Sequence, residues 1–135
     1  MSYALTTTVR RPFVDTLAAT RAALADQGFG ILTEIDMQAT LKAKLGVEIL
    51  QQVILGACRP LLAHAALQVE PSVGLLLPCN IVIRAIDHDT TVVEALDPKV
   101  IVSLTQNEAL SLVATEAGQR LEAALDTVTH ALANS

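Results

Sequence analysis

Two cysteines and a histidine are the residues of this chain best suited to bind a soft metal or to act as nucleophiles. Cys58 and Cys79 are its two cysteines, and His64, one of three histidines, lies between them in the sequence. Thiolate and imidazole groups are transition-metal ligands, and a thiolate is also a nucleophile and a redox group. The stretch from Leu55 to Asn80, which holds all three residues, is therefore the candidate site.

Cys58 ends a predicted strand and stands just before a predicted helix. Arg59 follows it, and Pro60 suits the first helical turn, where a missing N–H is not needed. The positive end of the helix and the Arg59 guanidinium both favour thiolate over thiol, so Cys58 is a candidate nucleophile, redox thiol or metal ligand. The alternative is a small buried residue that closes a strand, because free cysteine is among the most buried residue types.

Cys79 lies in a Pro-Cys-Asn sequence that we expect to interrupt the next strand. Such a break can aim the Cys79 side chain, or the backbone of Asn80, into a cleft. If the two strands are neighbours, the cysteines meet. In a reducing compartment such a pair is more often metal-binding or redox-active than a structural disulfide.

His64 lies one turn into the helix that begins at Pro60, and we expect it on the same face as the helix entrance. Cys58, His64 and Cys79 would then form a three-ligand metal site with an open fourth position. The alternative is a solvated or hydrogen-bonded histidine with no ligand role.

Acidic residues form a second group of candidates. Glu34 and Asp36 follow a predicted strand and, with Glu70, are candidates for a general base pair or a cation site. Helix capping is the competing explanation for Glu34 and Asp36. Lys42, further along the next helix, is a candidate for a salt bridge or for contact with an anionic ligand.

Several common functions lack their sequence motifs. The chain contains no C-x-x-C, H-E-x-x-H, G-x-G-x-x-G, P-loop or G-x-S-x-G sequence, which argues against nucleotide-binding and serine-hydrolase functions. Nine Lys and Arg residues against fourteen Asp and Glu give a net charge of −5. Nucleic acid is therefore a poor candidate partner.

The composition is unusually apolar. Hydrophobic residues make up 52% of the 135 residues and the mean hydropathy is +0.49, with only Tyr3, Phe13 and Phe29 as aromatics. The core must therefore be aliphatic. No apolar run is long enough to cross a membrane, and no signal sequence is recognisable at the N-terminus, so we expect a cytoplasmic protein. The excess of aliphatic residues suggests a homodimer.

The elements that position these residues follow from hydrophobic spacing and from proline and glycine. The pattern predicts a β-α-β-α-β-α-β-β-α order in a single α+β domain, residues 1–135, with a roughly five-stranded sheet and most helices on one of its faces. Strands are predicted at residues 6–9, 29–32, 53–57, 75–86 and 91–96. The segment 99–104 fits either a strand or a short helix.

The ends of the elements have local signals. Predicted helices begin near Pro12, after a cap at either Thr33 or Asp36, and near Pro60, and glycines end the first two, at Gly28 and Gly46. Within 75–86, Pro78 predicts a bulge or an edge strand, because proline cannot donate to a sheet ladder. A Thr105–Glu108 capping box is expected to begin a long amphipathic helix whose apolar spacing continues to Leu132.

Five ordered blocks of this sequence resemble the domain of unknown function 302 family. The resemblance implies a compact, dimeric α+β domain in a family whose biochemical role is unsettled, and it brings no catalytic assignment. It covers nearly the whole chain. The blocks are G-F-G-I-L-T-E-I-D at 28–36, L-K-A-K-L-G at 41–46, I-L-G-A-C-R-P at 54–60, A-L-Q-V-E-P at 66–71 and G-L-L-L-P-C-N at 74–80. The positions that match the family pattern are Glu34, Asp36, Lys42, Cys58, Pro60, Glu70, Pro78, Cys79 and Asn80.

Three functional classes follow from the residues. The first is a dimeric binding module whose cleft around Cys58 and Cys79 holds a small molecule or a metal. The second is a thiol- or metal-dependent enzyme or redox relay that uses the same cleft. The third is a structural dimer with inert cysteines. We rank the binding module first, because no base and orienting partner complete a catalytic arrangement in the sequence.

Overall fold

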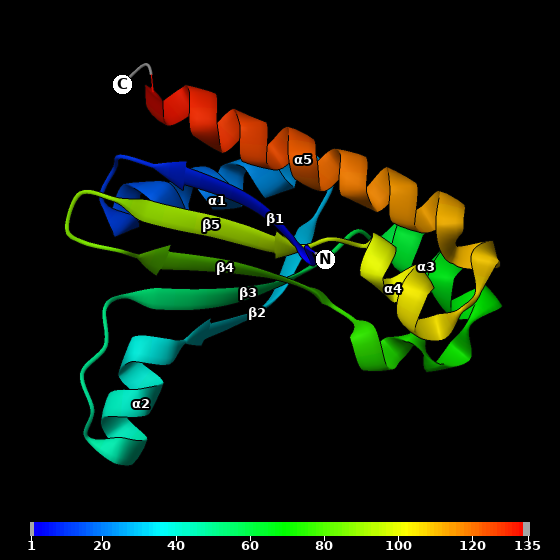
Figure 1. Cartoon of the computed structure of the whole chain (residues 1–135), viewed down its shortest axis with the longest axis horizontal. Helices are drawn as coiled ribbons and strands as arrows, with labels where there is room; N and C mark the ends of the chain where they lie inside the picture. The colour runs from blue at the N-terminus through cyan, green and yellow to red at the C-terminus, as the bar shows by residue number, and fades with distance from the viewer. Residues whose placement is uncertain (1, 134–135) are drawn as a thin grey trace.

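The fold is built on a five-stranded antiparallel sheet with the strand order β1-β5-β4-β3-β2 (Figure 1). The computed structural model describes residues 2–133, with side chains up to His130. The side chain of Leu132 is therefore outside the described residues. The strands are β1 (Ala4–Val9), β2 (Gly30–Asp36), β3 (Gln52–Cys58), β4 (Cys79–Ala85) and β5 (Thr91–Leu96).

The helices occupy three places around the sheet. Helices α1 and α5 pack against each other on one face, α2 projects from one end, and α3, η1, α4 and η2 gather at the opposite end (Figure 1). Within residues 2–133, no helix is long and apolar enough to cross a membrane. The predicted α+β class is confirmed. The helices are α1 (Phe13–Asp26), α2 (Met37–Leu45), α3 (Pro60–Val69), η1 (Pro71–Leu76), α4 (Lys99–Thr105), η2 (Glu108–Leu110) and α5 (Ser111–Ala133).

The main core lies between the sheet and helices α1 and α5. Alternate strand residues point to the same face, which places Leu55 of β3 and Ile83 of β4 in this core, both with no exposed surface. They belong to one buried cluster with Leu121 and Val128 of α5. The core is aliphatic, as the composition predicts.

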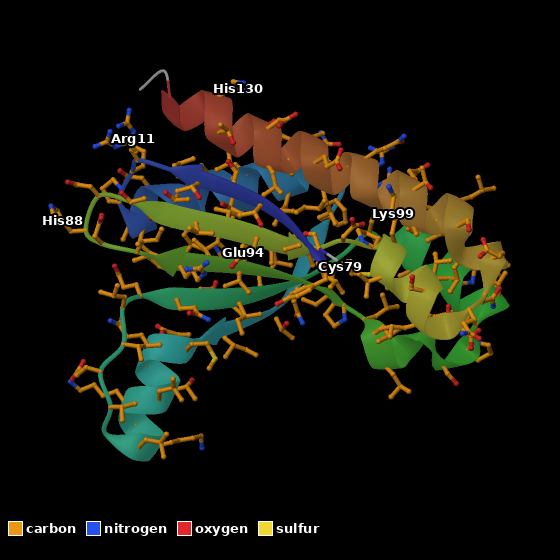
Figure 2. The ribbon with its side chains drawn as sticks, viewed as in Figure 1. Arg11, Cys79, His88, Glu94, Lys99 and His130 are labelled. Atoms are coloured by element: carbon orange, nitrogen blue, oxygen red, sulfur yellow. The ribbon has the colours of Figure 1, made fainter. Side chains whose placement is uncertain are left out.

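The other face of the sheet is more polar and partly exposed. Ile35 is 45% exposed, and the neighbouring Ile54 and Val82 are half-buried. Arg84 and Glu94 form an ion pair across β4 and β5 on this face, with Nε and Oε1 2.9 Å apart. Glu94 is labelled in Figure 2. The sheet therefore buries one face far more completely than the other.

Local signals predict the helix ends correctly. The Gly28 N–H donates to the Ala25 carbonyl and the Phe29 N–H donates to the Leu24 carbonyl, which is the Schellman pattern that follows a left-handed glycine. Gly46 closes α2 in the same left-handed conformation.

The beginnings of α2 and α3 also match their predictions. An Asp36 carboxylate oxygen accepts a hydrogen bond from the Ala39 N–H at the start of α2. Pro60 occupies the first turn of α3, where its missing N–H leaves no hydrogen bond unmade.

Strand β2 is longer than predicted. It continues to Asp36, through residues predicted to follow the strand, because Glu34 and Ile35 pair with Leu55 and Ile54 of β3. A bulge between Ile31 and Thr33 allows the strand to continue. Pairing with a distant strand overrides the local polar signal here.

The prediction for residues 75–86 is wrong in two respects. Residues 75–77 belong to η1 or to the link that follows it, and the strand begins only at Cys79. Pro78 therefore precedes β4 and needs no bulge, and β4 is an inner strand between β3 and β5. Cys79 begins the strand and does not interrupt it.

The predicted capping box before α5 is also wrong. Asn107 takes the capping role, because its side-chain oxygen accepts a hydrogen bond from the Ala109 N–H at the start of η2. Helix α5 begins only at Ser111. The ambiguous segment 99–104 is helical, within α4.

Candidate functional site

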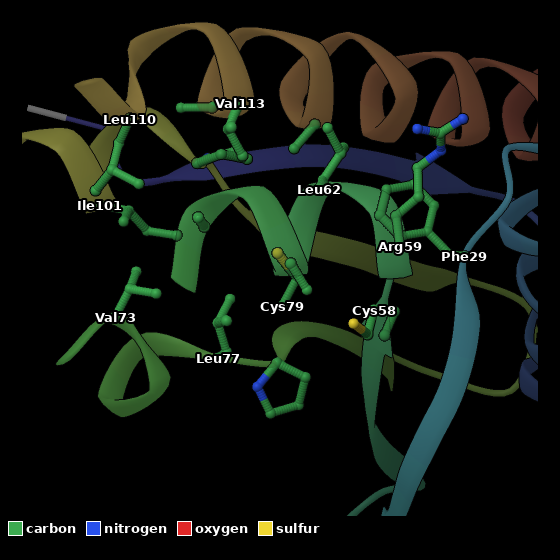
Figure 3. A pocket seen from close by; sticks show the side chains of 17 residues that line it. Phe29, Cys58, Arg59, Leu62, Val73, Leu77, Cys79, Ile101, Leu110 and Val113 are labelled. Atoms are coloured by element: carbon green, nitrogen blue, oxygen red, sulfur yellow. The ribbon is translucent and has the colours of Figure 1, made fainter. Parts of the chain in front are cut away.

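An apolar cavity lies at the end of the sheet where β3 ends and β4 begins. Its volume is about 50 Å³, and its walls come from the strand ends and from α3, α4 and α5 (Figure 3). The aliphatic wall includes Leu62 and Ala66 of α3, Ile101 of α4 and Val113 of α5. A second buried cluster, which includes Ala66, Val73, Ile101 and Leu110, supports this end of the molecule.

Both cysteines line this cavity (Figure 3). Cys58 is the last residue of β3, and Cys79 is the first residue of the neighbouring strand β4. Cys79 lies opposite Ala57 in the ladder, so the two cysteines are diagonal neighbours across adjacent strands. Both are free thiols and are partly buried.

The environment of Cys79 disfavours its thiolate. Burial raises the pKa of the Cys79 thiol, and a negative charge on Cys58 raises it further. This second effect requires the two sulfur atoms to be close enough for their charges to interact. Cys79 is therefore a weaker acid than an ordinary cysteine.

Arg59 connects the cavity wall to its surroundings. Its Nε donates to the Gln27 carbonyl at 3.2 Å, and its Nη1 donates to a Glu116 carboxylate oxygen at 2.9 Å. A Cβ at Gly28 would lie 3.0 Å from Arg59 Nε, so the guanidinium occupies the space that a side chain would need. Arg59 thus links the α1–β2 turn, the start of α3 and helix α5 beside the cavity.

Close packing around Gly56 of β3 holds the start of β4 in place. A Cβ added to Gly56 would lie 2.2 Å from Thr33 Oγ1 and 2.8 Å from Pro78 Cγ. Neither contact is possible for a real side chain. Glycine at position 56 therefore leaves room for the Thr33 and Pro78 side chains to pack over β3. Pro78 directly precedes Cys79, so this packing holds the start of β4.

Comparisons with known proteins agree with this architecture. The model of the family described as "Domain of unknown function DUF302" matches residues 5–128. The chain belongs to the DUF302 family. It is similar to the crystal structure of an uncharacterized conserved DUF302 protein from Bacillus stearothermophilus, with a TM-score of 0.86 and 28% identity over 94% of this chain and 98% of that one. No curated protein matches the chain.

The structure does not bring the histidines of this DUF302 chain to the cysteines. His64 is exposed and is not part of the cavity wall, because α3 turns Leu62, Ala63 and Ala66 toward the cavity instead. His88 lies in the β4–β5 turn, away from Cys79 (Figure 2). Within residues 2–133, no three His, Cys, Asp or Glu side chains are grouped to hold a metal ion. The expected placement of His64 beside the cysteines is therefore wrong.

The acidic candidates are separated from one another. Glu34 forms an ion pair with Arg21 of α1, and Asp36 caps α2. Glu70 accepts a hydrogen bond from the Asn107 side chain at 2.9 Å. Each of these carboxylates thus has a local structural partner, and the three do not meet in one cleft.

Lys42 and Asn80 also lie outside the cavity wall. Lys42 forms an exposed ion pair with Glu48 near the end of α2. Asn80 is exposed, and it points to the opposite face of β4 from Cys79 because strand residues alternate.

Small residues on two helices complete the site and were not predicted. Ala63 and Ala66 of α3 and Ala114 and Ala117 of α5 all line the cavity. Their spacing of three is visible in the sequence, but alanine at that spacing is common in helices. Only the packing of α3 against α5 makes these four residues a wall.

Proposed function

We propose that this DUF302 protein is a binding module whose cavity holds a small molecule or a metal ion beside Cys58 and Cys79. The observation that carries the proposal is the position of both cysteines on one cavity whose wall is otherwise apolar except for Arg59. Apolar pockets with a few convergent functional groups are typical ligand sites. The two thiols are the groups that would fix a ligand in place.

The composition of the wall favours binding over turnover. No His, Asp, Glu, Ser or Tyr lies among the described residues that line the cavity. A thiol enzyme normally places a base within hydrogen-bonding distance of its nucleophile, and a further group orients that base. Those partners are missing from the wall, so a binding role requires fewer assumptions.

A thiol-dependent enzyme or redox relay is the second candidate. It is favoured by the position of both free thiols on one cavity wall, where burial and then a charge on Cys58 raise the pKa of Cys79. Two neighbouring free thiols in a reducing compartment are typical of redox or metal sites, and a cytoplasmic location is part of this proposal. A structural domain with inert cysteines is the remaining alternative.

We further propose that the chain forms a homodimer. No residue of α2 is buried, and Leu45 and Leu50 around its C-terminal end are 70% and 57% exposed. Exposed apolar side chains on a projecting helix are typical of surfaces that a partner covers. Light scattering should give a solution mass near twice the 14.3 kDa of one chain, and a mass near one chain would contradict the dimer.

The binding proposal is tested by native mass spectrometry and metal analysis of the purified protein. We expect a bound small molecule or metal in the wild type and its loss in Ala66→Leu, because Ala66 is buried and lines the cavity. Ala22→Leu, at an exposed position on α1, is the matched control and should keep the ligand. Equal occupancy in all three proteins would contradict a ligand site in this cavity.

Thiol-reactivity titration separates the other two functions. Fast reaction of Cys58 with a disulfide reagent, followed by closure onto Cys79, would support a redox relay. Slow reaction of both thiols in a protein that carries no ligand would support inert cysteines. Cys58→Ser and Cys79→Ser identify which thiol reacts.

A further inference from the structure

The cavity offers two sulfur donors and no third ligand. Both cysteines line it, and no grouping of three His, Cys, Asp or Glu side chains exists within residues 2–133. Structural zinc sites use four protein ligands, and catalytic zinc sites normally use three. A zinc site is therefore a poor fit, and the donor set suits a cation that is satisfied by two soft ligands.

The two cysteines lie close together in the backbone at one end of the sheet. Cys79 pairs with Ala57, which directly precedes Cys58. Paired Cα atoms on antiparallel strands are about 5 Å apart, and one residue along a strand adds about 3.3 Å, so the cysteine Cα atoms are about 6 Å apart. Because side chains alternate along a strand, Cys58 points to the opposite face of β3 from Ala57 and Cys79, so a shared ion would be bound at the end of the sheet, on the cavity wall that both cysteines line.

The size of the cavity also favours an ion over an organic molecule. Its volume is about 50 Å³. An apolar cavity that takes up benzene has about 150 Å³, and a water molecule in the liquid occupies about 30 Å³. The space beside the thiols therefore fits a single heavy ion without rearrangement.

We propose that Cys58 and Cys79 together bind one copper(I) ion through two thiolates. Thiolate ligands select copper(I), zinc and iron–sulfur clusters. Of these, copper(I) is the ion that two thiolates can satisfy, and silver(I) is its redox-stable analogue. On binding, two Cys S–H bonds break and two S–Cu bonds form, and both protons are released to solvent. The proposal rests on the binding function above and names the ligand class for the same cavity.

The charges around the cavity are consistent with this ion. Without a cation, each thiolate disfavours the other, whereas a bound cation stabilises both. The bis-thiolate complex carries one negative charge, which the N-terminus of α3 beside Cys58 stabilises. The Arg59 guanidinium itself donates to Gln27 and Glu116. Beyond Arg59, Glu116 also interacts with Arg120, at 3.5 Å from its Nε. Cys58, Cys79 and Arg59 are the titratable residues among the described residues of the wall.

Anaerobic titration of the reduced full-length protein with copper(I), against a chromophoric copper(I) chelator, tests the proposal. We expect one ion per chain in the wild type and in the control His64→Ala, since His64 is exposed and lies outside the wall. Cys58→Ser and Cys79→Ser should each weaken binding at least about 100-fold, the upper end of what losing an outer-shell partner costs. The affinity should rise with pH, because two protons leave.

Two results would overturn the copper(I) site. One is equal affinity in the wild type and the serine variants, and the other is no one-to-one binding by the wild type. Cys79→Ala and thermal melting of every variant show whether a loss of binding reflects unfolding. Xenon binding, measured by nuclear magnetic resonance, tests separately whether the cavity accepts any ligand. Xenon uptake without copper(I) binding leaves the binding module intact, and uptake of neither contradicts both proposals.

Discussion

The two ends of the sheet use their chemically capable residues in opposite ways. At the end that carries α2, Asp36 caps a helix and Lys42 pairs with Glu48, both at the surface. At the other end, Cys58 and Cys79 are partly buried on one apolar cavity. Residue types of comparable reactivity therefore serve the local fold at one end and remain available to a ligand at the other.

The difference shows that a partner in the fold distinguishes a structural residue from a candidate functional one. Glu34 and Asp36 already have a cation or an N–H group that uses their charge. The thiols have each other and an aliphatic wall, which raises the pKa of Cys79 and leaves the sulfur atoms free for a soft ligand. Substitutions at the two ends should therefore differ in both size and kind of effect.

The largest expected effect comes from the packing that positions Cys79. Gly56→Ala should lower the free energy of unfolding by about 3 kcal/mol, because its Cβ would collide with Thr33 and Pro78. Gly74→Ala is the matched control, since a Cβ there meets nothing within 4 Å. Urea unfolding measures both. Equal stability of the two variants would show that Gly56 does not need to be glycine.

The next effect concerns the connection beside the cavity. Arg59→Ala should cost about 1 to 2 kcal/mol, because it removes charge-assisted hydrogen bonds to Gln27 and Glu116 from a side chain that is only 18% exposed. Lys42→Ala at the other end should cost less than about 0.5 kcal/mol, because its ion pair is exposed. Urea unfolding measures both variants. A larger loss of unfolding free energy in Lys42→Ala than in Arg59→Ala would contradict the expectation that the ion pair beside the cavity contributes more to stability than the exposed one.

A smaller loss is expected at the start of α2. Asp36→Ala should destabilise the protein by about 1 kcal/mol, because the Ala39 N–H loses its acceptor. Asp36→Asn retains the acceptor and should behave nearly as the wild type. Thiol reactivity at Cys58 and Cys79 should stay the same in both variants, and a change there would connect the two ends.

The pH dependence gives the smallest but most specific effect. The pKa of Cys79 is raised in the folded state, so the unfolded chain releases this proton first as the pH rises. The contribution of Cys79 to the free energy of unfolding is fully present below the pKa of the unfolded thiol. It is lost as the pH rises from that value through the raised pKa of the folded thiol. Thiolate absorbance should titrate Cys79 at lower pH in Cys58→Ser than in the wild type, because the Cys58 charge is gone. An unchanged midpoint would mean that the two sulfur atoms do not interact.

The sequence predicts the parts of the fold that depend on neighbouring residues. Pro60, Gly28 and Asp36 act on backbone groups within a few positions, so the helix ends they mark can be recognised without the fold. The placement of Cys58 between a strand and a helix follows from the same local rules. The strand continuing to Asp36 depends on pairing with β3, which local polarity does not reveal.

The candidate site was less predictable because its parts meet only after the chain folds. His64 shares a helix with Ala63 and Ala66, and which of them faces the cavity depends on how α3 packs against α5. Pro78 predicts an interrupted strand, but β4 begins only after it, at Cys79. The Pro78 ring instead packs against Gly56, with its Cγ 2.8 Å from where a Cβ at position 56 would lie. Both errors arose because packing between segments far apart in the sequence, which local patterns do not show, decides where His64 points and where β4 begins.

The shared position of the two thiols is tested most directly by arsenite, which carries no organic group that the small cavity would exclude. Arsenite forms a stable product with two neighbouring thiols, in which two As–S bonds replace two As–O bonds and two water molecules are released. We expect one molecule per reduced chain to protect both Cys58 and Cys79 from alkylation, as measured by mass spectrometry, with no stable product in Cys58→Ser or Cys79→Ser. Free alkylation of both cysteines in wild-type protein treated with the reagent would contradict a common site.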